Sequence, residues 1–155
     1  MKYKLFISLI ILAFFSSFRF GEPSATLTCK SASGRTIFKA ELAGTNSVEK
    51  AELKIDDSNL TFTQNDKSYI IFDPANKVFT IYLESKTSGN NDQIFFLRFW
   101  AIPDSFNPVS SKKGSGTQFQ NVYEFKAKLE STEPRKGKEF NTPVIELICN
   151  LDYEL

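Results

Sequence analysis

The chain has 155 residues, a length that suits one domain, and it contains two cysteines and no histidine. Without histidine it cannot form a Ser–His or Cys–His catalytic arrangement or an imidazole metal site. With 19 basic and 18 acidic residues, the formal net charge is only +1, which gives no electrostatic footprint for a nucleic-acid partner.

The chain begins with the pattern of a secretory signal peptide. Lys2 and Lys4 precede the apolar run Leu5–Phe15. This run is shorter than the ~20 apolar residues that a transmembrane helix needs. We therefore expect a signal peptide over 1–21, cleaved somewhere within 17–25, and an exported product that is periplasmic or secreted. A cleaved signal peptide would contact the membrane only before its removal. The alternative is that the segment is not cleaved and anchors the protein in the membrane.

Residues 26–155 show the alternation of apolar and polar side chains that is typical of β-strands. In chain order, the expected strands are 26–30, 35–42, 50–56, 60–63, 68–72, 78–84, 93–102, 119–130 and 144–155. No apolar stripe with helical spacing occurs in this part of the chain. About nine strands, joined mostly by short turns, predict an all-β domain over 26–155, built as a single antiparallel β-sandwich or barrel.

The two cysteines fall in the first and last expected strands, each on the apolar face. Cys29 shares its face with Leu27, and Cys149 shares its face with Leu147 and Leu151. A disulfide between them needs Cβ atoms within about 4.5 Å, so the two strands would be neighbours in one sheet or face each other across the core. One disulfide fits an oxidising compartment; the alternative is two free, buried thiols.

The strand at 93–102 differs from the others because both of its faces are apolar. One face carries Phe95, Leu97, Phe99 and Ala101, and the other carries Ile94, Phe96, Arg98, Trp100 and Ile102. Such a strand is either covered on both sides or carries an exposed patch. Because Arg and Trp are enriched in binding hot spots, Phe96, Arg98 and Trp100 are candidate partner-binding residues. The alternative is core packing, with Arg98 paired to an acid or stacked on Trp100.

Two long segments, 103–118 and 131–143, lack clear alternation and are expected to be loops. Loops of this length are often functional. The second contains Arg135, Lys136 and Lys138, a further candidate binding cluster that suits an anionic partner or surface. The alternative is a solvated turn.

Together these features predict a non-enzymatic, exported β-domain that binds a protein or surface glycan at the cell envelope or outside the cell. A second hypothesis is a β-barrel carrier, in which many of the 16 phenylalanines line a cavity for a small apolar ligand. A third is a carboxylate-dependent hydrolase, which needs two carboxyl groups about 5–10 Å apart. Acids such as Glu52 and Asp56 are instead expected on solvent-facing sides of strands. No catalytic set, cofactor, metal or nucleic-acid partner is expected.

Overall fold

The computed structural model describes residues 24–44, 46–87, 93–113, 119–133 and 137–154. These residues form eleven strands and one short 3-10 helix, η1 (Pro103–Ser105). The strands are β1 (Ser24–Lys30), β2 (Thr36–Ala43), β3 (Ser47–Ile55), β4 (Ser58–Thr63), β5 (Lys67–Asp73), β6 (Val78–Thr87), β7 (Gln93–Ala101), β8 (Asn107–Lys113), β9 (Phe119–Glu133), β10 (Gly137–Asn141) and β11 (Ile145–Glu154). The expected signal peptide over 1–21 lies outside the described residues. Within them, no helix is long and apolar enough to cross a membrane.

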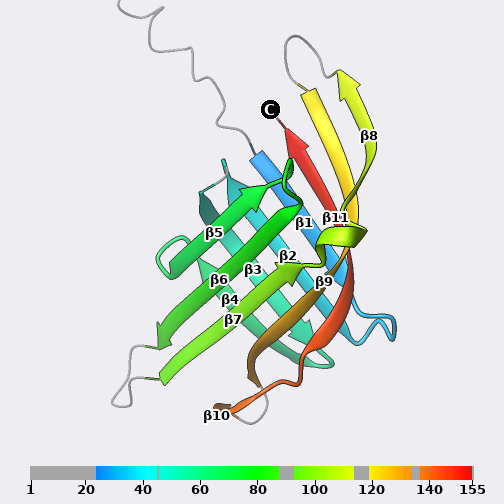
Figure 1. The fold of residues 1–155 in the computed structure, drawn as a ribbon. Coiled ribbons are helices and arrows are strands. Elements are labelled where there is room, and N and C mark those ends of the chain that lie inside the picture. Colours follow the sequence, from blue (N-terminus) through cyan, green and yellow to red (C-terminus); the bar gives the residue numbers. More distant parts are fainter. Residues whose placement is uncertain (1–23, 45, 88–92, 114–118, 134–136, 155) are drawn as a thin grey trace, which may run out of the picture.

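All the strands belong to one antiparallel sheet that curls into a half-barrel (Figure 1). The strand order is β4-β3-β2-β1-β11-β9-β7-β6-β5, and β8 and β10 both pair with β9 off this path. In Figure 1 the half formed by β5, β6 and β7 crosses in front of the half formed by β1 to β4. The prediction of an antiparallel all-β fold is confirmed, whereas a sandwich of two separate sheets is not.

The two segments expected to be loops contain the strands β8 and β10, so the estimate of about nine strands was too low. β7 and β8 pair one after the other with the same side of β9. Between them, the five residues 102–106 span only two residues of β9, 125 and 126, so the pairing is interrupted there. The Ser105 hydroxyl stabilises this break, because its oxygen accepts a 2.8 Å hydrogen bond from the Lys126 N–H. Both β8 and β10 are held by pairing with β9, and the described side chains of β8 are mostly exposed, so no apolar face repeats along that strand.

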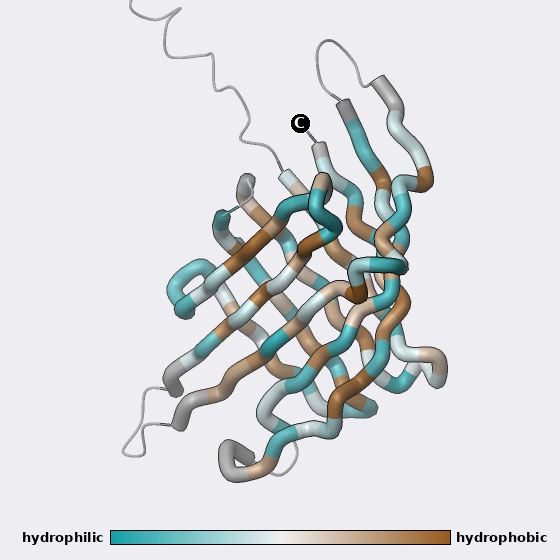
Figure 2. The backbone as a smooth tube through the Cα atoms, in the orientation of Figure 1, coloured by the Kyte–Doolittle hydropathy of each residue, from teal (hydrophilic) through white to brown (hydrophobic). Residues whose placement is uncertain are grey.

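Phenylalanine rings fill the concave side of the sheet. The Phe99 ring centre lies 5.4 Å from that of Phe38 and 5.5 Å from that of Phe79. Phe106, just after η1, reaches the same core, and its ring centre lies 4.8 Å from that of Phe125. Hydrophobic and hydrophilic residues alternate along the strands in Figure 2, which places one set inside and the other outside. Burying each ring stabilises the fold by roughly 1.5–3 kcal/mol.

The predicted disulfide between Cys29 and Cys149 is present. The two residues are directly opposite in the antiparallel pair of β1 and β11, with Cα atoms 4.0 Å apart, so the two strands are neighbours in one sheet. Both cysteines are fully buried. The bond therefore joins the first and last strands at the middle of the sheet, across a sequence separation of 120 residues.

Candidate partner-binding face

The register of β5, β6, β7 and β9 brings outward-pointing side chains into rows across the convex side of the sheet. The central row runs Tyr69, Tyr82, Arg98, Glu130, and the rows on either side contain Lys67, Glu84 and Phe96, and Ile71, Thr80, Trp100 and Lys128. The residues between them in sequence, such as Leu97 and Phe99, are buried in the core. We call the set Tyr69, Ile71, Tyr82, Phe96, Arg98 and Trp100 the outer aromatic face.

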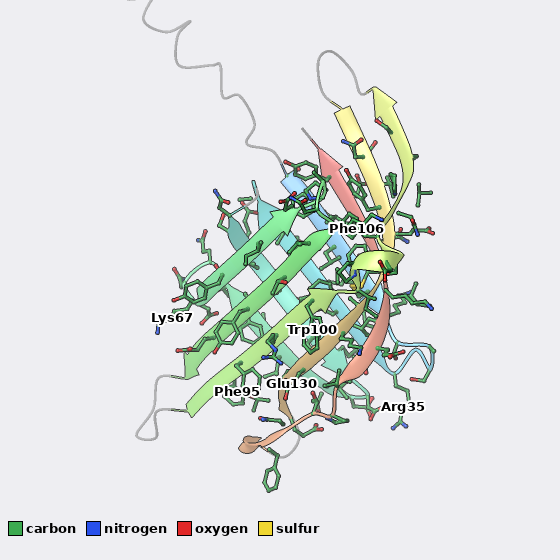
Figure 3. The ribbon with its side chains drawn as sticks, viewed as in Figure 1. Arg35, Lys67, Phe95, Trp100, Phe106 and Glu130 are labelled. Atoms are coloured by element: carbon green, nitrogen blue, oxygen red, sulfur yellow. A yellow bond between two sulfur atoms is a disulfide. The ribbon has the colours of Figure 1, made fainter. Side chains whose placement is uncertain are left out.

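Arg98 is the centre of this face. Its guanidinium carbon lies 4.9 Å from the Trp100 ring centre, and its Nη2 atom lies 3.4 Å from Glu130 Oε2. Figure 3 shows Trp100 on β7 and Glu130 on the neighbouring β9. The Arg98 side chain remains 56% exposed despite both contacts. At exposed sites a cation–π contact stabilises by about 0.5–1 kcal/mol and an ion pair by at most about 1 kcal/mol, so these contacts orient the guanidinium more than they stabilise the fold.

The structure places Phe96, Arg98 and Trp100 together, as the sequence predicted. Arg98 does pair with an acid and stack on Trp100, but it does so on the outside of the sheet and not in the core. Phe96 and Trp100 are half-buried, so the outer face of β7 is only partly open to solvent, on either side of the exposed Arg98. The second candidate cluster has no described geometry: Arg135 and Lys136 lie outside the described residues, and only the backbone of Lys138 is described, in β10.

A tyrosine pair extends the face toward the edge of the sheet. The ring centres of Tyr69 and Tyr82 are 6.1 Å apart. The Tyr82 hydroxyl donates a 3.3 Å hydrogen bond to Glu84, whose other carboxylate oxygen lies 3.3 Å from Lys67 Nζ. Partial burial raises the pKa of Tyr82, and the negative charge of Glu84 raises this pKa further. Tyr82 therefore remains a neutral hydroxyl that can donate or accept a hydrogen bond at physiological pH.

Sequence reasoning missed Tyr69, Ile71 and Tyr82 as members of this face. A local signal existed for β5, because Tyr69 and Ile71 alternate with the inward-pointing Ile70 and Phe72. Apolar residues therefore occupy both faces of β5, as they do in β7. What the sequence lacked was the strand order that brings β5 and β6 beside β7.

Glu52 and Asp56, the acids considered for hydrolysis, are both engaged in ion pairs. Glu52 lies 2.7 Å from Lys50, whose hydrogen bond and charge lower the pKa of Glu52. Asp56 lies 2.6 Å from Arg35. In the described part of the chain, no group of three or more His, Cys, Asp or Glu residues is arranged to hold a metal ion. Glu52 and Asp56 are therefore surface groups that form salt bridges.

The chain was compared with known proteins in three ways. No family model, no curated protein and no solved structure matches it. Function must therefore be inferred from the described side chains and their arrangement.

Proposed function

We propose that this protein is a non-enzymatic, exported β-domain that binds a protein or surface-glycan partner through the outer aromatic face. The observation that supports this most strongly is the row in which Arg98 lies between Tyr82 and Glu130 while covering part of Trp100. Tyr, Trp and Arg are the residues most enriched among those that dominate binding energy. On adjacent strands of one sheet, these side chains lose little conformational freedom when a partner binds.

The charges around this face favour a partner of mixed polarity. Lys128 and Lys67 supply positive charge, and Glu130 and Glu84 supply negative charge, within the same rows as the aromatic rings. Such a surface offers apolar contact area at the rings and both donors and acceptors at its borders, as protein interfaces do. It lacks the single-sign basic patch that nucleic acid requires.

Two observations support export to the periplasm or to the outside of the cell. The first is the signal-like start of the sequence, with its basic residues and apolar run. The second is the Cys29–Cys149 disulfide, because structural disulfides persist in oxidising compartments.

The two other functions receive less support. A carrier of an apolar ligand needs phenylalanines that line open space, but the Phe99 ring packs against those of Phe38 and Phe79 in the core. A carboxylate-dependent hydrolase needs a free pair of acids, whereas Glu52 and Asp56 are each salt-bridged to a basic residue.

Affinity capture tests the proposal directly. Immobilised wild-type protein is exposed to envelope extract and culture medium, and in parallel to a glycan array, alongside the variants Arg98→Ala and Trp100→Ala. We expect each variant to weaken the captured partner's binding by about tenfold or more, since hot-spot residues contribute more than about 1 kcal/mol. The control is Thr61→Ala, which alters an exposed residue of β4, at the end of the strand order opposite to β5. If both variants retain every partner of the wild type, the face is wrongly assigned.

A further inference from the structure

The strand β5 lies at one end of the strand order and forms an edge of the sheet. Among the described strands it pairs only with β6, so its other side presents unpaired backbone N–H and C=O groups. Protein edges are normally protected by lysine or proline within the strand, by a bulge, or by a covering segment. β5 has no lysine or proline between its first and last residues, and its pairing with β6 runs without a register shift.

The outward side chains of β5 are also unusually apolar for an edge. Tyr69 is 65% exposed and Ile71 is 60% exposed. The opposite edge strand, β4, presents the polar residues Asn59, Thr61 and Thr63 at its exposed positions. Within the described chain, β8 and β10 also pair on one side only and expose Val109 and Phe140, but each has a lysine inside the strand and a register shift in its pairing. Among the described strands, β5 is therefore the unprotected edge that combines free backbone groups with exposed hydrophobic area, the combination that favours addition of another strand.

The sequence of β5 is complementary to itself when two copies run antiparallel and are centred on Ile70. In this register Lys67 lies opposite Asp73 of the other copy, and Tyr69 lies opposite Ile71. Twofold symmetry repeats each of these pairs. Opposite charges and aromatic–β-branched pairs are the cross-strand contacts that stabilise antiparallel strands. A shift by two residues would place Lys67 against Ile71, or Asp73 against Tyr69, and would lose the charge pairs.

The charged residues at both ends of β5 are held in place by the chain itself. Lys67 contacts Glu84 at 3.3 Å but remains 62% exposed. Asp73 accepts hydrogen bonds from the Asn76 backbone and side-chain amides, at 3.1 and 2.7 Å, and these bonds lower the pKa of Asp73. An ionised carboxylate has about four acceptor positions, so Asp73 can still receive a lysine from a second copy.

We infer that two copies of this chain associate through antiparallel pairing of their β5 strands, which joins the two sheets into one continuous sheet. The second copy satisfies the free backbone groups of the edge and covers Tyr69 and Ile71. The outer aromatic faces of the two copies then lie on the same side of the joined sheet. The pairing uses Tyr69 and Ile71, at the border of the outer aromatic face, but neither Arg98 nor Trp100 on β7, so its test is separate from that of the proposed function.

Sedimentation velocity of the exported, disulfide-bonded protein tests this inference. The wild type should shift from one to two chains in mass between low micromolar and millimolar concentration. Lys67→Asp places two acids opposite each other, and Asp73→Lys places two lysines opposite each other. Each change occurs twice in the dimer, so each should weaken association by about tenfold. The double variant with both changes restores opposite charges and should restore association.

Two further measurements guard against misfolding as an explanation. Ile71→Lys alters a side chain outside the core and should give a folded monomer, as judged by near-ultraviolet circular dichroism. The control variant Thr61→Lys, on the β4 edge, should leave association unchanged. Hydrogen exchange of the wild type should show the β5 amides becoming more protected as concentration rises. A wild type that stays monomeric throughout the range, β5 amide protection that does not depend on concentration, or a folded Ile71→Lys variant that dimerises like the wild type would overturn the inference.

Discussion

Removing the disulfide should produce a large loss of stability without a change of fold. The bond joins residues separated by 120 positions, so it restricts almost the whole of the described chain in the unfolded state. The chain-entropy relation for a closed loop of this length gives about 5 kcal/mol at 25 °C. The double variant Cys29→Ala/Cys149→Ala should keep its native sheet, because β1 and β11 pair from Ser24 to Lys30 on both sides of the bond.

Urea unfolding followed by circular dichroism measures this loss. With a denaturant slope of about 2–3 kcal/mol/M, a loss of 5 kcal/mol corresponds to a midpoint lower by about 2 M. The slope itself should rise, since an unlinked unfolded chain exposes more surface. Wild-type protein unfolded in the presence of a thiol reductant is the control and should match the variant. Equal midpoints for the oxidised wild type and the double variant would refute the view that this bond constrains the unfolded chain.

Three smaller changes test the core and the turn after β5. Phe99→Ala should lower the free energy of unfolding by about 3–5 kcal/mol because the ring is fully buried among other rings; a loss under about 1 kcal/mol in urea unfolding would contradict the packed core. Lys77→Gly should raise stability by up to about 1 kcal/mol because Lys77 has a φ of 58°, which glycine adopts without strain; a lower melting temperature would count against this. Asn76→Ala should raise the pKa of Asp73, measured by NMR titration of its carboxyl group, because the Asn76 side chain no longer donates to it. The folded-state pKa of Asp73 is lowered, so its stabilising contribution is present above its unfolded-state pKa and is lost as pH falls through the folded-state value. The variant should therefore lose less stability on acidification than the wild type does. An unchanged pKa of Asp73 would exclude this role for Asn76.

Local sequence determined which residues of most strands point inward. The alternation at Leu27 and Cys29, and again at Leu147, Cys149 and Leu151, correctly placed these side chains in the core and made the disulfide predictable. The same reasoning failed for β8 and β10. The sequence of β8 has no alternation to detect, because neither of its faces lies in the core: Asn107, Pro108, Val109 and Ser111 are exposed. A strand that buries neither face is held by its backbone pairing, here with β9, and needs no apolar side.

The candidate face was predictable only in part. A spacing of two residues placed Phe96, Arg98 and Trp100 on the same side of one strand, and the structure agrees. Because the opposite side of that strand is equally apolar, the sequence could not decide which side faces solvent. The contribution of Tyr69 and Tyr82 depends on the order of β5, β6 and β7 in the sheet.

The single tryptophan of the chain offers the most direct test of the outer aromatic face as a binding surface. Trp100 is half-buried under the Arg98 guanidinium, so its fluorescence should be partly quenched by acrylamide in the free protein. The decisive measurement is acrylamide quenching of Trp100 with and without the partner recovered by affinity capture. We predict that bound partner lowers the quenching constant; an unchanged constant with the partner fully bound would contradict the assignment of this face.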